Sequence, residues 1–134
     1  MTADLNASQR ALLREAERAR VVGYAPYSNF KVGAAVRTRS GKIYTGCNIE
    51  NASYSLSICA ERVAIFNAVS NGDQDIVELA VCADAETPSR PCGACRQVFS
   101  EFAAMGDIIM GNLNGLVDKR CIQELFPEPF QLND

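Results

Sequence analysis

Histidine and tryptophan are both absent from this 134-residue chain, and it contains no hydrophobic run long enough to cross a membrane. Without imidazole, any tightly bound zinc must be held mainly by thiolates. No apolar run approaches the ~18 residues of a membrane span, and residues 1–20 lack the ~7–15-residue apolar stretch of a signal peptide. We therefore expect no membrane partner and a cytoplasmic location.

The chain also lacks an excess of positive charge. It has 13 basic and 16 acidic residues, a net charge of -3, whereas a protein that grips a phosphate backbone usually presents a basic stripe. A nucleic-acid partner is therefore not expected. With 48% hydrophobic and 22% charged residues, the composition is typical of a soluble globular protein. The length predicts a single domain, 1–134, small enough to gain from oligomerisation.

Hydrophobic periodicity and turn residues predict alternating helices and strands. Ser8 can cap the first helix, and Pro91 can open a later one because its missing N–H costs nothing at the first position. The run 76–83 is nearly all apolar, as in a central strand buried on both faces. The expected helices are 8–23, 58–70, 91–102 and 122–126, and the expected strands are 30–37, 42–46, 76–83, 108–111 and one from Val117, with loop at 47–57. This order indicates a mixed sheet covered by helices, in the α/β class.

Six cysteines are present, and three of them lie in two short signatures, C-A-E at 59–61 and P-C-G-A-C at 91–95. In a reducing compartment, cysteines at such spacing are more often ligands or catalytic groups than disulfides. Both signatures fall at predicted helix starts, where Cys59 and Glu61 can converge over the open helix end. Cys92 and Cys95 are three apart, so one helical face carries both. Two helix N-termini then favour thiolates at one point.

Three thiolates with one carboxylate suit an open metal site better than a closed structural one, which would offer four ligands. Three thiolates and one zinc(II) ion give the site one net negative charge, which raises the pKa of bound water. Helix dipoles and a nearby cation must offset that charge. Arg62 and Arg96 each follow a signature directly, and we favour Arg62.

The two signatures together are the three-cysteine form of the zinc-deaminase pattern, in which one Cys or His and a Glu precede P-C-x-x-C. The glutamate of that pattern is not a ligand. It takes a proton from the activated water and passes it to the base. Glu61 is therefore the candidate catalytic residue. The candidate zinc ligands are Cys59, Cys92 and Cys95.

Other interpretations of the same cysteines remain open. A lone C-x-x-C is often structural or redox-active, and Cys47 could complete a closed four-thiolate site, although Glu61 would then have no task. Cys82 and Cys121 are interpreted as small core residues. A non-catalytic zinc-stabilised module would bind zinc without deaminase activity, and a redox dithiol protein would bind none.

Further motifs accompany the two signatures in a fixed order. They are Y-S-N-F-K-V-G-A-A at 27–35, G-C-N-I-E-N-A at 46–52, Tyr54, C-A-E-R at 59–62 and P-C-G-A-C-R-Q at 91–97. On these motifs the chain resembles the small homotetrameric cytidine deaminases from about Tyr24 to Phe130. The resemblance implies a three-layer α-β-α cytidine-deaminase-like fold with a mixed five-stranded sheet. It also implies a homotetramer with shared active sites, and zinc-dependent deamination of cytidine and deoxycytidine to uridine and deoxyuridine with release of ammonia.

The same resemblance implies a set of nucleoside contacts within the chain. The residues matching Asn48 and Glu50 hold a ribose hydroxyl, which suits an amide and a carboxylate two apart in extended chain, since both side chains can face one way. The residue matching Phe30 packs against the nucleoside, and the backbone of Ala60 contacts the pyrimidine.

Three further residues are implied to act across a subunit interface. The residues matching Ala52 and Tyr54 reach a neighbour's pocket, and Phe130 matches a C-terminal aromatic that stacks on the base. The sequence L-F-P-E-P-F at 125–130 also leaves Phe126 as the candidate for that stacking role. Arg90, directly before the P-C pair, is unusual and has no assigned role.

Two rival substrates are compatible with the same fold. One is another aminopyrimidine nucleoside, such as a nucleoside antibiotic, and the intact Asn48 and Glu50 pair argues against it. The other is a polynucleotide, which the acidic charge balance disfavours.

Overall fold

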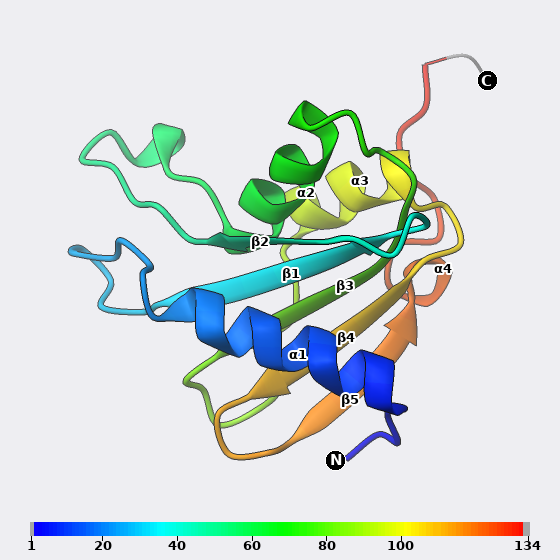
Figure 1. The fold of residues 1–134 in the computed structure, drawn as a ribbon. Coiled ribbons are helices and arrows are strands. Elements are labelled where there is room, and N and C mark those ends of the chain that lie inside the picture. Colours follow the sequence, from blue (N-terminus) through cyan, green and yellow to red (C-terminus); the bar gives the residue numbers. More distant parts are fainter. Residues whose placement is uncertain (1, 133–134) are drawn as a thin grey trace.

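Five strands form one mixed sheet at the centre of the molecule (Figure 1). The structure is a computed structural model and describes residues 2–132. The strands are β1 (Val32–Thr38), β2 (Ile43–Cys47), β3 (Ile76–Ala83), β4 (Asp107–Asn112) and β5 (Val117–Cys121). Their order in the sheet is β2-β1-β3-β4-β5, with β3 and β4 parallel and the other neighbours antiparallel. The expected mixed five-stranded sheet is confirmed.

Helices cover both faces of this sheet (Figure 1). They are α1 (Ala7–Arg20), the 3-10 turn η1 (Tyr54–Leu56), α2 (Ala60–Ser70), α3 (Gly93–Phe102) and the short α4 (Ile122–Leu125). Side chains alternate between the two faces of a strand, so α1 packs on the face that carries Ala35 and Ala80. On the opposite face, α2 and α3 pack over Val36 and Leu79. The result is the expected three-layer α-β-α arrangement.

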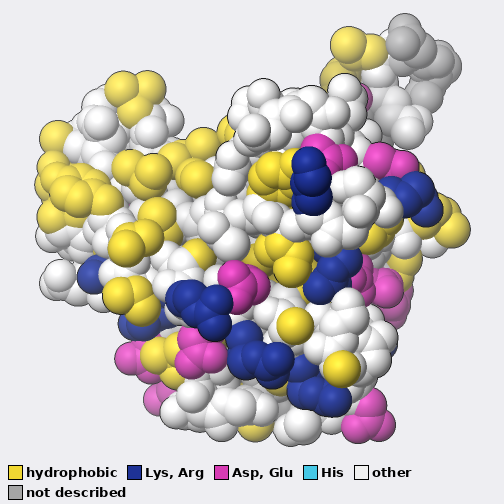
Figure 2. All heavy atoms as spheres, viewed as in Figure 1, with side chains coloured by type: hydrophobic (Ala, Val, Ile, Leu, Met, Phe, Trp, Pro, Cys, Tyr) yellow, Lys and Arg dark blue, Asp and Glu magenta, His cyan; other side chains and the backbone are white. Residues whose placement is uncertain are grey.

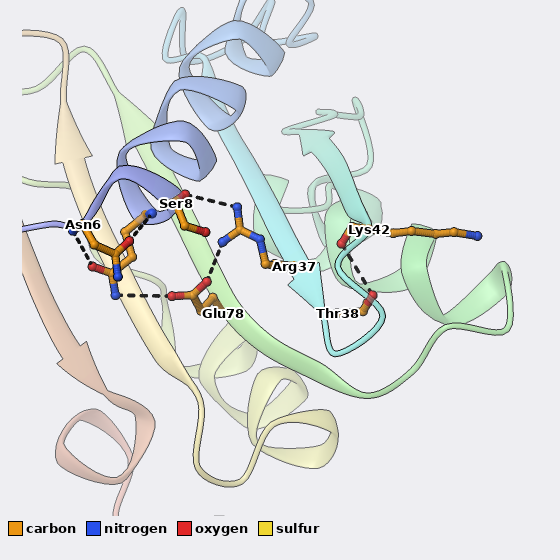
Figure 3. A network of polar contacts seen from close by, with 7 residues as sticks. Asn6, Ser8, Arg37, Thr38, Lys42 and Glu78 are labelled. Atoms are coloured by element: carbon orange, nitrogen blue, oxygen red, sulfur yellow. Dashed lines mark hydrogen bonds and ion pairs between the residues drawn. The ribbon is translucent and has the colours of Figure 1, made fainter.

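A capping box at Asn6, rather than the expected cap at Ser8, begins α1. The Asn6 side chain accepts from the Gln9 N–H at 2.8 Å, and the Gln9 side chain accepts from the Asn6 N–H at 3.1 Å. Gln9 also donates to Glu78 on β3 at 3.3 Å, and Arg37 on β1 donates to the same carboxylate at 2.6 Å (Figure 3). Arg37 further donates to the Ser8 carbonyl at 3.1 Å. This network fixes the start of α1 against the two central strands.

The expected element starts need small corrections. β1 begins at Val32 rather than at residue 30, because Asn29 has a left-handed φ of 57° and turns the chain just before it. α2 begins at Ala60 rather than at residue 58, because Ile58 still forms an antiparallel bridge with Ile49. β2 extends through Cys47, and α1 ends at Arg20. By contrast, β3 spans the expected range 76–83.

The surface is more unevenly charged than the net charge suggests. Figure 2 shows Lys and Arg side chains gathered over α1, whose exposed residues include Arg10, Arg14 and Arg18 together with Glu17. Apolar side chains gather instead at the loops on one end of the molecule (Figure 2). Within residues 2–132, none of the helices combines the length and the apolar character that crossing a membrane requires.

Candidate active site

Three cysteine sulfurs meet where α2 and α3 begin. Cys59 is the N-cap of α2, Cys92 is the N-cap of α3, and the fully buried Cys95 lies in the first turn of α3. The Sγ atoms of Cys59 and Cys92 are 3.9 Å apart, those of Cys92 and Cys95 are 3.6 Å apart, and all three lie within 4.8 Å of one another. Tetrahedral zinc with Zn–S bonds of about 2.3 Å separates its sulfurs by roughly 3.8 Å. The cluster therefore fits three corners of a tetrahedral zinc site.

The remaining cysteines lie elsewhere. Within the described residues, the metal-ligating cluster consists of the three cysteines alone. Cys47 sits on β2 opposite Gly33 of β1, and Cys82 is buried in the core under α1. Cys121 is half-buried against the core on the other face. A set of three thiolates indicates an open zinc site and argues against the four-thiolate arrangement with Cys47.

The two capping cysteines owe their orientation to the way the helices start. Each helix begins after its signature cysteine, so Cys59 and Cys92 occupy N-cap positions with extended backbone. Neither side chain bonds to the backbone of its own helix, which leaves both sulfurs directed at the common point. The partial positive charge of two helix N-termini then stabilises thiolates there.

Arg62 is the cation that contacts the sulfur cluster. Its Nη2 donates to Cys59 Sγ at 3.2 Å, whereas Arg96 donates to the carbonyls of Pro91 and Leu125 at 2.9 and 2.8 Å. Hydrogen bonding from Cys95, and then the Arg62 contact, lowers the pKa of the Cys59 thiol to about 5. The pKa of Cys95 is raised because its hydrogen bond to Cys59 and its burial favour the protonated form. Cys59 is thus a thiolate at neutral pH, balanced by a guanidinium.

Glu61 is a buried carboxylate beside this cluster. It is the second residue of α2 and is only 4% exposed. Burial raises the pKa of Glu61 to about 7, and the negative charge at Cys59 adds to that rise while Arg62 opposes it. A carboxyl group with a pKa near neutrality can both take up and release a proton at physiological pH.

A cavity of about 320 Å³ opens over the cysteine cluster and Glu61. Residues of the two signatures line one part of this cavity, and residues of the loops before β1 and after β2 line another. Its lining includes Ser28, Phe30, Asn48, Glu50, Ser57, Cys59, Ala60, Glu61, Arg90 and Cys92. A wider hollow of about 440 Å³ between α1 and the β4–β5 turn contains none of these residues. The fold thus brings the expected nucleoside-contacting residues Phe30, Asn48, Glu50 and Ala60 to the thiolates and the carboxylate.

Asn48 is oriented by the backbone that precedes and begins β1. Its Nδ2 donates to the Phe30 carbonyl at 2.7 Å, and its Oδ1 accepts from the Val32 N–H at 2.9 Å. Gly23 allows this arrangement, because a Cβ at that position would lie 2.8 Å from Asn48 Oδ1. An amide has two donor hydrogens and two acceptor positions, so Asn48 keeps one of each for a ligand.

Glu50 is held by a second set of donors, in which Ser28 is a residue that the sequence did not single out. One Glu50 oxygen accepts from the N–H groups of Tyr27 and Ser28 at 2.9 and 3.2 Å. The Ser28 hydroxyl donates to the other oxygen, and this bond is the main reason that the pKa of Glu50 is lowered. Only the position of Ser28 in the Y-S-N-F motif could have drawn attention to it.

Three expected contact residues lie outside this cavity. Of the described residues that line it, none is Ala52, Tyr54 or Phe130. Ala52 is exposed, and Tyr54 and Phe130 are 76% and 69% exposed. Phe126, the alternative to Phe130, is half-buried and packs against the core. The sequence also left Arg90 without a role, and its guanidinium pairs with Asp118 on β5 at 2.9 Å.

This three-layer fold, with thiolates at two helix N-termini and a buried glutamate beside an open cavity, is that of the zinc-dependent deaminases. The model of the cytidine and deoxycytidylate deaminase zinc-binding region matches residues 6–112. The chain belongs to this family.

Individual relatives agree with that assignment over nearly the whole chain. A cytidine deaminase of Halalkalibacterium halodurans is 46% identical over 127 residues, which cover 94% of this chain and 96% of that protein. A crystal structure of cytidine deaminase from Burkholderia pseudomallei superimposes with a TM-score of 0.88 at 43% identity, covering 94% of this chain and 100% of that one. A blasticidin-S deaminase of Bacillus cereus is 33% identical over 110 residues, 76% of this chain and 78% of that protein.

Proposed function

We propose that this protein is a zinc-dependent cytidine deaminase, which hydrolyses cytidine and deoxycytidine to uridine and deoxyuridine and releases ammonia. The observation that carries the proposal is the cavity shared by two groups of residues. Cys59, Glu61 and Cys92 line one part of it, and Asn48 and Glu50 line another. A zinc-stabilised module without activity would need neither the buried carboxylate nor the oriented amide.

In this proposal Cys59, Cys92 and Cys95 are the zinc ligands, and Arg62 offsets part of their negative charge. Zinc bound there would supply an activated water molecule at the amine-bearing carbon of the base. Glu61 would take one proton from that water and give it to N3 of the ring. It would then take the second proton from the hydroxyl now on the carbon and deliver it to the leaving amine, as the carbonyl forms and ammonia departs. Its pKa of about 7 suits both steps, because neither the uptake nor the release of the proton is strongly uphill.

The remaining cavity residues would bind the nucleoside. Asn48 and Glu50 offer a donor and several acceptors to ribose hydroxyls, and both are held in place before the ligand arrives. Phe30, which is 43% exposed, offers an apolar surface to the nucleoside, and the Ala60 backbone contacts the pyrimidine. Preorganisation of this kind reduces the ordering cost of binding.

The proposal includes a homotetramer in a cytoplasmic location. Ala52, Tyr54 and Phe130 would then act in the cavity of a neighbouring copy. Support comes from their exposure on this chain and from the implied sharing of sites in the family.

Replacing Glu61 by Ala or Gln tests the proposed function. We expect turnover of cytidine, followed as the loss of its ultraviolet absorbance, to fall by at least about 10²-fold, the lower end of what a positioned acid–base group contributes. Zinc content should stay near one per chain, since Glu61 is not a ligand. Glu101→Gln, the same chemical change at an exposed position of α3, is the matched control and should keep wild-type turnover. Near-normal turnover in the Glu61 variants would overturn the mechanism, and a chelator-insensitive activity would overturn the role of zinc.

A second candidate substrate is another aminopyrimidine nucleoside. The similarity to a blasticidin-S deaminase, at 33% identity, is the observation that favours testing it. A panel of cytidine, deoxycytidine and blasticidin S decides between the two. A kcat/KM at least tenfold higher for blasticidin S than for cytidine would replace the first candidate.

A further inference from the structure

The chain after α4 returns to α3, where the main chain of Phe130 is held by Gln97. Gln97 on α3 donates from Nε2 to the Phe130 carbonyl at 3.1 Å, and its Oε1 accepts from the Phe130 N–H at 3.0 Å. One side-chain amide thus pairs with both polar main-chain groups of Phe130, as a neighbouring strand would. Figure 1 shows this C-terminal segment beside α3, the helix whose start carries Cys92 and Cys95.

The ring of Phe130 is exposed although its main chain is held. The residue is 69% exposed, and among the described residues lining the cavity of its own chain it does not occur. Phe126, only four residues earlier, packs against the core in the ordinary way. A large aromatic side chain that is fixed at the backbone yet kept out of the core is suited to a contact with another molecule.

The exposed aromatic side chains near the cavity offer a contact surface for such a ring. Phe30, Tyr27 and Tyr54 around this end of the molecule are 43%, 51% and 76% exposed, so the aromatic surroundings of the cavity are open to solvent. Aromatic rings pair favourably with each other and with planar ligands when they are offset or edge-on. A second copy of this chain carries both the exposed Phe130 and an open cavity, so two copies can complete each other.

We propose that Gln97 is a positioning residue, which holds Phe130 so that its ring enters the nucleoside cavity of a second copy. This inference rests on the proposed function, in which Phe130 contributes to a neighbouring site. It adds the group that fixes the ring. The two hydrogen bonds restrict the main chain at residue 130 before association, so less conformational freedom is lost when the ring docks.

The two hydrogen bonds between Gln97 and the main chain of Phe130 form a clamp. Their chemistry predicts a ranking of substitutions at position 97. Glutamine supplies one donor and one acceptor, and both are used. Gln97→Glu keeps the acceptor but faces the Phe130 carbonyl with a second oxygen. Gln97→Met has a similar length and removes both polar groups. Neither change touches the zinc ligands or Glu61, so the zinc content should remain that of the wild type.

The test is a double-mutant cycle of Gln97→Met and Phe130→Ala in the zinc-loaded, full-length protein. We expect Gln97→Met to raise KM for cytidine by about 5-fold, with a smaller change in kcat. A change of that size corresponds to a net loss of roughly one ordinary hydrogen bond. Phe130→Ala should raise KM further. The double variant should match Phe130→Ala within about 2-fold, because a clamp has no effect once the ring is gone. Gln97→Glu should fall between the wild type and Gln97→Met.

The outcomes separate this inference from the proposed function. If Phe130→Ala leaves KM unchanged while Glu61→Ala abolishes turnover, the deaminase stands and both the shared ring and the clamp are wrong. If Phe130→Ala raises KM but Gln97→Met does not, or if the two effects multiply in the double variant, only the clamp is wrong. Glu101→Gln, on the same helix and lining the same groove as Gln97 and Phe130, serves as control and should leave KM unchanged.

Discussion

Glu50 accepts from three donors of residues 27 and 28, and the Ser28 hydroxyl is the one that a side-chain substitution can remove. The same Ser28 oxygen also accepts from the Phe30 N–H at 3.0 Å. One serine therefore links the carboxylate to the loop that carries the aromatic wall of the cavity. Such side-chain-to-backbone bonds set the orientation of a ligand-binding group without contacting the ligand.

We expect Ser28→Ala to raise KM for cytidine by about 3- to 10-fold, within the range for the net contribution of one ordinary hydrogen bond, with little change in kcat. The pH dependence gives a second signature. The Ser28 bond lowers the pKa of Glu50, so the ionised form persists until the pH falls through that lowered pKa. The proposed ribose contact should persist over the same range. Without Ser28 the pKa returns toward its ordinary value, and KM should begin to rise at a higher pH than in the wild type. Steady-state kinetics across the acid range measures both effects.

Ser55→Ala on the exposed η1 turn is the control for this experiment, and it should leave KM and its pH profile unchanged. A Ser28→Ala enzyme with wild-type KM at all pH values would show that the backbone donors alone orient Glu50.

Residues of this kind mark the limit of prediction from the sequence. The thiolates, Glu61 and Arg62 lie within two short signatures, so local helix geometry was enough to suggest that they act together. Ser28 and Glu50 are separated by 22 positions, and Gln97 and Phe130 by 33. Their pairing depends on tertiary structure, and no periodicity or spacing rule reports it.

At the scale of elements, the relation between β2 and α2 decides where the first thiolate lies. Gly46 of β2 faces the first turns of α2, and a Cβ there would lie 2.4 Å from the Ala64 nitrogen and 2.7 Å from the Ala60 oxygen. Both are backbone atoms, so no side-chain rotation can relieve the contact. The absence of a side chain at Gly46 sets how closely α2, and Cys59 at its cap, approach the sheet.

Gly46→Ala should therefore displace the start of α2. We expect it to lower the free energy of unfolding by about 1–3 kcal/mol, as overpacking usually does, and to speed zinc release because Cys59 moves relative to Cys92 and Cys95. Urea denaturation and zinc transfer to a chromogenic chelator measure the two effects.

Gly93→Ala is the matched control for that change. Gly93 lies between two of the thiolates, but a Cβ there meets nothing within 4 Å. Its stability and zinc release should stay close to the wild type, within about 1 kcal/mol. Wild-type zinc release in Gly46→Ala would mean that the position of α2 does not control the cluster.

The sequence predicts elements well where one signal dominates and poorly where two compete. The run of β3 is apolar except for Glu78, and its bounds were confirmed. Helix periodicity ran back to Ile58, but that residue pairs with Ile49 in a bridge formed by a distant segment. Tertiary pairing thus delays the start of α2, and this delay puts Cys59 at the cap, where its sulfur faces α3.

At the scale of the whole molecule, the loops that rim the cavity are unusually apolar for a free surface. Val22, Tyr24, Tyr54 and Leu56 are 75%, 56%, 76% and 69% exposed, and Figure 2 shows apolar side chains gathered at this end. Patches of this kind mark association surfaces. The patch lies beside the cavity, because the main chain of Tyr24 pairs with those of Asn48 and Glu50. Association there would place a second copy next to the cavity as well as hold the copies together.

Subunit complementation tests whether active sites are shared between copies. Chains carrying Glu61→Gln have an inactive cavity but an intact Phe130, and chains carrying Phe130→Ala have the reverse. If the ring acts in a neighbouring cavity, a site works when its own chain carries Glu61 and its neighbour carries Phe130. Random one-to-one mixing satisfies both conditions in roughly one quarter of the sites.

We therefore expect co-refolded mixtures to recover about a quarter of the wild-type kcat/KM at low substrate concentration, well above the average of the two parents. Mixtures of Glu61→Gln with wild type should retain about half. If the ring instead acts in its own cavity, the mixture will show only the average of its parents, because no combination of chains then restores a complete site.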